Sequence, residues 1–419
     1  MPYLAIAALS GVVVLSYVFS IISGKTRIPT VLMLLVLGIG LREASTALDA
    51  EVDVPLEFLQ FVGVLGLIII LLEAGLDLSM SKEKLPMIKR ATASSLFVLA
   101  LTTAGIAIII YVAFGQAWLS SIVYAVPLAV ISSTMVASSI GHLKKNKREF
   151  LTYESALSDV FGILLFNFLI AGQRLDPGVV TVEVLGLIAA VLASIGISIG
   201  LVFLLAKVDV NIKAFLIISV LLLIYAVGHA WQLPTLLTVL IFGIVINNWS
   251  HSSFRPFHKH LTTGDVESAA ETVTAVTVES AFLVRTVFFV LFGYSIDIRS
   301  LWDANVLLVG SAIVACILGM RYLYLIVFGR GHILPELFFS PRGLVTIVLF
   351  YSIPASLQLT GFSSGILLFV VLATTVIMMI GSVCFTPKNA RRGSANVVVE
   401  GGAKVQREEL VGKRHLRIE

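Results

Sequence analysis

Charged residues and cysteines are scarce in this sequence. Asp, Glu, Lys and Arg make up only 13% of its 419 residues, about half of their usual share in a soluble domain. The two cysteines, Cys316 and Cys384, lie far apart in separate apolar runs. That placement is typical of buried small side chains rather than of a disulfide or a metal site. The shortage of charge excludes a chain of ordinary soluble domains.

Basic residues give no indication of a nucleic-acid partner. The formal net charge is +4, and most Lys and Arg residues fall in short polar segments and in the C-terminal stretch. No basic residue precedes the first apolar run. We therefore expect that run to be a membrane span rather than a cleavable signal peptide.

Long apolar runs are abundant. Hydrophobic residues make up 58% of the chain, and runs long enough to cross about 30 Å of hydrocarbon recur from end to end. We predict an all-α polytopic membrane protein with thirteen transmembrane helices in residues 1–385 and a short tail in 386–419. The predicted ranges are 3–23, 28–41, 58–77, 87–113, 120–142, 149–172, 182–206, 213–230, 233–248, 268–295, 303–328, 336–357 and 361–385.

The loops between these ranges alternate in basic charge. Loops after odd-numbered helices hold most Lys and Arg residues, whereas loops after even-numbered helices hold only Arg42, Arg174 and Arg299. Because basic loops stay on the cytoplasmic side, we predict a cell (inner) membrane protein with its N-terminus outside and its C-terminus in the cytoplasm. The tail is too short for a nucleotide-binding domain, and we expect it to be solvated. Contact with anionic lipid headgroups is the alternative.

Two carboxylates lie inside the sixth predicted helix. Glu154 and Asp159 are surrounded by apolar residues, and a charge at bilayer depth costs roughly 2.5–3.5 kcal/mol. A separation of five residues places them about 140° apart around a helix, so we expect them to meet different partners. Such groups line a polar pathway or pair with Arg side chains for structure, and the residues alone leave both interpretations open.

The fifth and twelfth predicted helices contain segments that favour an interruption. Ser133 and Thr134 belong to a hydroxyl cluster that can satisfy a broken backbone or join helices. Pro341 and Gly343 flank Arg342 inside an apolar run, which indicates a break or a loop end with a snorkelling arginine. Interrupted spans at corresponding places in two halves are typical of an inverted-repeat transporter. We therefore predict repeats over about 3–172 and 213–385.

Arg285 and Glu73 are further charged residues within or near apolar runs. Arg285 lies among phenylalanines and needs a carboxylate partner, for which Glu154 is the natural candidate. Glu73, near the end of the third predicted helix, could line an aqueous funnel or mark the helix terminus. We predict a buried Glu154–Arg285 ion pair.

The sixth helix resembles a known family. Residues 154–159 read Glu-Ser-Ala-Leu-Ser-Asp, which is similar to the Glu-Ser-x-Leu-Asn-Asp motif of monovalent cation/proton antiporters of the sodium/proton exchanger type. Arg285 before Phe-Phe-Val, and Arg342-Gly343 in the twelfth helix, are further points of similarity. The resemblance extends over essentially the whole membrane part of the chain.

The resemblance implies a core domain with two unwound, crossing helices beside an ion site, and a dimerisation domain that forms a homodimer. Asp159 would bind Na⁺ or a proton in turn, Glu154 and Arg285 would form a structural ion pair, and Arg342 would stabilise the unwound helix. The further cation- or proton-binding residues would be Ser155, Ser158, Ser133, Thr134 and Glu73. The implied partners are the transported ions and the lipid bilayer, with no cofactor.

Two departures from the family pattern bear on the transported ion and the stoichiometry. Ser158 stands where exchangers have asparagine or aspartate, and it adds no titratable group, which favours one-for-one, electroneutral exchange. Ser133-Thr134-Met135 stands where exchangers usually have Thr-Asp-Pro, and it resembles the Ser-Ser-Thr of potassium-efflux relatives.

These observations predict a secondary transporter rather than an enzyme. One carboxylate cannot hold a proton and a cation together, so competition for Asp159 would couple H⁺ to Na⁺, with Li⁺ as a further substrate, by alternating access. The alternatives are a potassium/proton antiporter and a cation channel, although the sequence contains no repeated filter loop. No metal-ligand spacing or Ser/His pair in the apolar runs indicates an enzyme.

Overall fold

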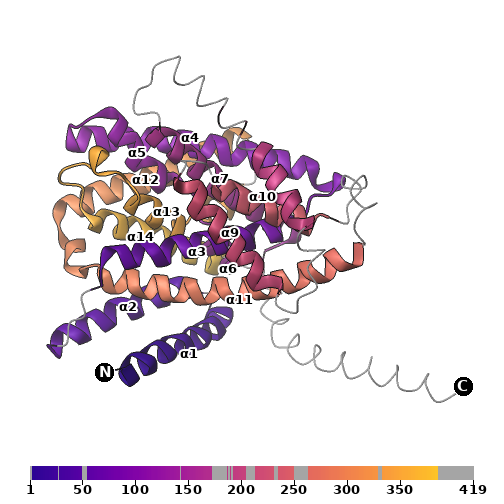
Figure 1. Ribbon diagram of the computed structural model, residues 1–419. Helices are drawn as coiled ribbons and strands as arrows, with labels where there is room; N and C mark the ends of the chain where they lie inside the picture. The colour runs from indigo at the N-terminus through magenta and orange to yellow at the C-terminus, as the bar shows by residue number, and fades with distance from the viewer. Residues whose placement is uncertain are drawn as a thin grey trace, which may run out of the picture.

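The computed structural model describes residues 2–26, 28–49, 54–141, 143–171, 186, 189, 192–203, 213–230, 235–249, 263–328 and 333–385. All regular secondary structure within these residues is helical, as predicted. The long helix α11 runs beside α3, and α1 lies at the outside of the bundle (Figure 1). The helices are α1 (Pro2–Thr26), α2 (Thr30–Ala47), α3 (Leu56–Asp77), η1 (Lys82–Lys84), α4 (Leu85–Phe114), α5 (Trp118–Ala129), α6 (Ser133–Ser139), α7 (Lys145–Ala171), α9 (Lys213–Ala230), α10 (Thr235–Asn247), α11 (Thr263–Ser295), η3 (Ile298–Trp302), α12 (Ala304–Phe328), η4 (Glu336–Phe338), α13 (Leu344–Tyr351), η5 (Ala355–Leu357) and α14 (Ser364–Cys384).

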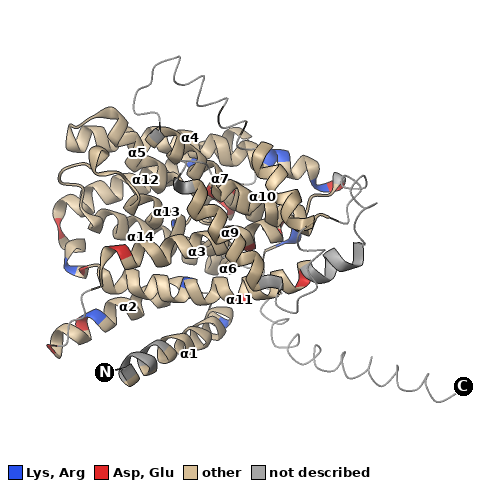
Figure 2. Ribbon diagram, viewed as in Figure 1, with Lys and Arg blue, Asp and Glu red and all other residues tan. Residues whose placement is uncertain are grey.

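Eight segments of the described chain are long and apolar enough to cross a membrane. Figure 2 shows that Lys and Arg lie mostly near the ends of the helices, while the long central stretches carry little charge. This distribution is typical of a multi-pass membrane protein. The predicted span at 182–206 falls partly outside the described residues, with an apolar helix at Leu192–Phe203, so the number thirteen remains a prediction.

The described helices pack as two groups. The α11 group consists of α1–α3 and α9–α11, which contact one another. The α4 group consists of α4–α7 and α12–α14, again with contacts among its members. Contacts of α3 with α7 and α13 join the two groups. Each group takes helices from the first and the second half of the chain.

Close crossings inside the α11 group depend on glycine. A Cβ atom on Gly38 of α2 would lie 2.9 Å from the backbone nitrogen of Tyr294 in α11. A Cβ atom on Gly75 of α3 would lie 2.7 Å from the carbonyl oxygen of Leu240 in α10. Because each crossing brings backbone against backbone, neither position has room for a larger side chain.

Both predicted interruptions are present. Helix α5 ends at Ala129 and α6 begins at Ser133, with residues 130–132 extended between them. In the second half of the chain, residues 339–343 are non-helical and separate η4 from α13, which has only eight residues. The two interruptions meet, since the Ser132 amide donates a 3.0 Å hydrogen bond to the Pro341 carbonyl. They form the centre of the α4 group, next to α7.

Candidate functional site

Each interruption frees backbone groups that side chains from elsewhere satisfy. The Ile131 amide donates to the hydroxyl oxygen of Ser158 on α7 at 3.0 Å. This bond fastens the extended segment to α7 one residue before Asp159. Ser158 therefore has a structural contact here, and its predicted role in cation binding stays a prediction.

Asp159 lies at the meeting point of α7 and the first interruption. Its side chain is 2% exposed. Oδ2 accepts hydrogen bonds from the Ser133 backbone amide at 3.2 Å and from the Ser133 hydroxyl at 2.5 Å. Oδ1 is buried and has no hydrogen-bond partner within the described part of the protein. A buried carboxylate oxygen without a partner is rare in folded proteins, and it has unused capacity for a proton or a cation.

Two further hydroxyl groups that were predicted to bind the ion, those of Ser155 and Thr134, lie on the helices next to Asp159. Ser155 is on α7 and donates to the carbonyl oxygen of Leu151 at 2.8 Å. Thr134 is on α6 and shares a 3.1 Å hydrogen bond with Ser132. Each hydroxyl oxygen keeps lone pairs, so Ser155 and Thr134 stay predicted ligands.

Arg342 connects the two interruptions. Its side chain is 1% exposed, and Nε and Nη2 donate to the Leu128 and Ala129 carbonyls at 2.6 and 3.0 Å. Nη1 donates to the Ser340 carbonyl at 2.5 Å. Leu128 and Ala129 are the last residues of α5, where the helix leaves carbonyls unsatisfied and its dipole favours a cation. Arg342 thus caps the broken fifth helix from the segment that precedes α13.

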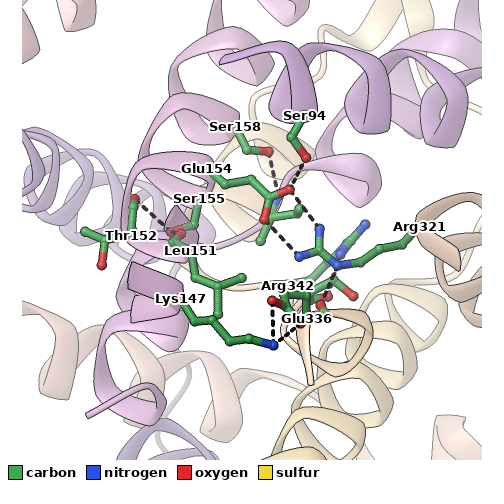
Figure 3. Close-up of polar contacts among 12 residues, drawn as sticks. Ser94, Lys147, Leu151, Thr152, Glu154, Ser155, Ser158, Arg321, Glu336 and Arg342 are labelled. Atoms are coloured by element: carbon green, nitrogen blue, oxygen red, sulfur yellow. Dashed lines mark hydrogen bonds and ion pairs between the residues drawn. The ribbon is translucent and has the colours of Figure 1, made fainter. Parts of the chain in front are cut away.

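The predicted Glu154–Arg285 ion pair is wrong, because Glu154 pairs with Arg321 of α12. Nη1 and Nη2 of Arg321 lie 3.2 and 2.8 Å from Oε1 and Oε2 of Glu154, and both side chains are 1% exposed. Ser94 of α4 also donates to Glu154. Figure 3 shows Glu154 held between Ser94 and Arg321. The physical reason is proximity: α7 and α12 both pack on α4, within one helix group.

The same cluster extends to the segment before α13. Nε of Arg321 donates to the carbonyl oxygen of Glu336 at 2.8 Å. Nζ of Lys147, in the first turn of α7, lies 2.9 Å from the Glu336 carboxylate (Figure 3). The cluster therefore joins α4, α7, α12 and η4 in one charged network.

Arg285 pairs with Glu73 instead. Its Nη2 lies 2.8 Å from Glu73 Oε2, between α11 and α3. The two side chains are 18% and 20% exposed, so this pair is less deeply buried than the Glu154–Arg321 pair. The role of Glu73 in cation binding stays a prediction, and its charge is matched by Arg285 in this structure.

Sequence reasoning missed Arg321, although a signal was available. Seven apolar or aromatic residues, 322–328, follow it in the chain. An arginine so far inside an apolar run needs a carboxylate, by the argument that was applied to Arg285. Ser94 gave no comparable signal, because serine is a common residue at helix contacts.

Comparison with known proteins places the chain in a family. Residues 11–387 match the family model described as sodium/hydrogen exchanger, transmembrane. The chain belongs to this family. It is therefore a multi-pass membrane protein of a family of cation/proton exchangers, which are transporters and not enzymes.

Solved structures show the same fold. The sodium proton antiporter MjNhaP1 from Methanocaldococcus jannaschii, at pH 8, is 18% identical with a TM-score of 0.66, over 91% of this chain and 98% of that chain. A structure of MjNhaP1 from an electron-microscopy map is 16% identical with a TM-score of 0.65, over 91% and 95%. No individually curated protein matches this chain by sequence.

Proposed function

We propose that this protein exchanges protons for Na⁺ across the cell membrane, with Asp159 as the shared binding group. The observation that carries the proposal is the buried Asp159 carboxylate, whose Oδ1 has no partner within the described residues. A hard monovalent cation suits oxygen ligands, and the hydroxyls of Ser133, Thr134 and Ser155 lie on the elements that adjoin this carboxylate.

Competition at Asp159 would couple the two ions. The carboxylate holds either a proton or a cation, so release of one on each side of the membrane permits binding of the other. The residue before Asp159 is the non-titratable Ser158, which already accepts the Ile131 amide. We infer a single carrier carboxylate and one-for-one, electroneutral exchange.

The two helix groups would provide alternating access. We assign the α4 group as the core domain that carries the ion and the α11 group as the dimerisation domain. Each group takes corresponding helices from the two halves of the chain, and each half contains one interruption. The glycine crossings at Gly38 and Gly75 also join one half to the other. These features support inverted repeats, whose relative movement exposes a central site to each side in turn.

We further propose that a second copy covers the face formed by α1 and α11. Glu279 is exposed on α11 inside a candidate span. The hydroxyl of Tyr17, a residue of α1 that is 48% exposed, lies 3.0 Å from the Glu279 carboxylate. A carboxylate open to hydrocarbon is costly, so protein contact at this face favours a homodimer.

The proposed orientation places the start of α3 outside the cell and the C-terminus in the cytoplasm.

Proton flux in proteoliposomes tests the proposed function. Addition of Na⁺ to vesicles that contain a pH-sensitive dye is expected to move protons with the wild-type protein and not with Asp159→Asn. Glu57→Gln is the matched control, because it changes an exposed carboxylate in the first turn of α3. Undiminished flux in Asp159→Asn contradicts the site. The same assay with Li⁺ and K⁺ separates sodium/proton from potassium/proton exchange, and absence of coupled flux in the wild type favours a channel.

Stoichiometry is tested by adding a membrane potential. With K⁺ and valinomycin setting the voltage, the steady-state pH difference supported by a Na⁺ gradient is expected to be independent of voltage. A pH difference that follows the potential would contradict electroneutral exchange.

A further inference from the structure

Helix α13 contacts α3 across the boundary between the two helix groups. The Gln60 amide Nε2, on α3, donates to the backbone carbonyl of Tyr351 at 2.8 Å. Tyr351 is the last residue of α13, and the Ser352 and Ile353 amides that follow bond to Val348, Leu349 and Phe350 instead. A side chain of the α11 group therefore satisfies an end carbonyl of the α4 group.

Two glycines of α3 continue the same contact. A Cβ atom on Gly63 would lie 2.8 Å from Val348 Cγ2 and 2.9 Å from Phe288 Cε2. A Cβ atom on Gly66 would lie 3.2 Å from Leu344 Cδ1. The contacts advance along α3 as they go back along α13, so the two helices run antiparallel and meet from one end of α13 to the other.

The position of α13 gives this contact a consequence for the ion site. Helix α13 begins directly after Arg342 and Gly343, in the interruption that meets Ser132. It extends from there towards the side of the membrane on which α3 begins, because Gln60 lies in the first turns of α3. The α3–α13 contact therefore stands between the interruptions and that side.

We propose that the α3–α13 contact is the closure that separates the Asp159 site from the side on which α3 begins, and that Gln60 is its latch. This inference rests on the proposed alternating access. The Gln60–Tyr351 hydrogen bond can act as a latch, because a carbonyl partly buried at the contact gains a donor from Gln60, while a carbonyl exposed to water finds one in the solvent. The bond thus favours the closed form and is replaced easily once water enters.

Reversible cross-linking tests whether α13 leaves α3 during turnover. In a background with Cys316→Ala and Cys384→Ala, Gln60→Cys and Tyr351→Cys are joined by short bis-methanethiosulfonate linkers, whose bonds a thiol reductant reverses. We expect the linked protein to stop Na⁺-driven proton movement and to recover after reduction. Recovery shows that the variant is folded. Normal exchange in the fully linked protein would overturn the proposal.

A matched cross-link provides the control. The Gln116 amide donates to the Thr360 carbonyl at 2.8 Å, and both residues belong to connections within the α4 group. Gln116→Cys linked to Thr360→Cys is expected to exchange at the unlinked rate. If the background protein shows no exchange before linking, the proposed function fails. If the protein exchanges before linking and the link between residues 60 and 351 leaves the rate unchanged, the proposed closure fails and the proposed function stands.

Thiol labelling tests the latch without locking the protein. With Leu344→Cys as a reporter in the cysteine-free background, a membrane-impermeant thiol reagent is added from the side on which α3 begins. Because a typical hydrogen bond contributes about 0.5–1.5 kcal/mol, Gln60→Leu is expected to speed labelling about 2- to 12-fold. Equal labelling rates with glutamine and leucine at 60 would contradict the role of Gln60.

Discussion

Replacing Arg321 with methionine is expected to destabilise the protein much more than replacing Arg285 with methionine. The side chains of Arg321 and Glu154 are each 1% exposed, whereas those of Arg285 and Glu73 are 18% and 20% exposed. Removing one partner of a fully buried pair costs about 3–5 kcal/mol, because the other charge is left without compensation. Removing one partner of a partly exposed pair costs less, about 1 kcal/mol or below where solvent screens the charges.

A double-mutant cycle distinguishes the two candidate partners of Glu154. In a Glu154→Gln background, Arg321→Met no longer strands a carboxylate, so it is expected to cost about 1.5–3 kcal/mol less than in the wild type. Arg285 has no contact with Glu154 in the structure. The change in unfolding free energy caused by Arg285→Met should therefore agree within about 0.5 kcal/mol between the two backgrounds.

The free energy of unfolding is measured on purified protein in mixed micelles, with sodium dodecyl sulfate as denaturant and tryptophan fluorescence as the signal. Proton flux of the refolded protein checks that unfolding is reversible. Coupling of more than about 1 kcal/mol between 154 and 285, or additivity of the changes at 154 and 321, would refute the pairing. Equal costs for Arg321→Met and Arg285→Met would refute the argument from burial.

Three further changes have defined outcomes. Arg342→Gln is expected to reduce exchange at least tenfold, because α5 loses the donors that cap its last carbonyls; Arg342→Lys, with fewer donors in a different geometry, should restore only part of the rate. Ser133→Ala is expected to raise the Na⁺ concentration for half-maximal proton flux severalfold, because Asp159 loses a hydroxyl neighbour and keeps only the backbone amide. Gly343→Ala is expected to abolish exchange, because its Cβ would contact the Ser132 side chain where the interruptions cross, whereas Gly319→Ala, with open space around it, should exchange normally.

Much of the fold could be predicted from apolar run length. Helices α3, α4, α11 and α14 begin and end within a few residues of the predicted ranges, because spans are bounded by the polar residues that mark the membrane edge. The interruption before α13 was also predictable, since Pro341 and Gly343 both weaken a helix. The interruption in the fifth helix was less certain, because its hydroxyl residues fit an intact helix equally well.

The partners of the buried charges could not be predicted with the same success. Charge balance requires that Glu154 and Arg285 each have a partner, but it does not say which one. The choice depends on which helices share a group, and this is a property of tertiary packing that no local pattern in the sequence records. Asp159 could be proposed as the ion-binding residue from the sequence because its motif is local, with Ser155 and Ser158 within one turn on the same helix.

Charge balance around Asp159 connects the site to electroneutral exchange. Within the described part of the protein, Glu154 is neutralised by Arg321, while Asp159 and Arg342 have no oppositely charged side chain at ion-pair distance. Arg342 donates to backbone carbonyl groups, and in the proposed exchange a proton or Na⁺ cancels the Asp159 charge. On that proposal, the α4 group would carry the same total charge with either ion bound. Movement with Na⁺ in one direction and with a proton in the other would then transfer no net charge, and a charged, unloaded Asp159 would oppose the movement, because a buried charge without compensation is costly.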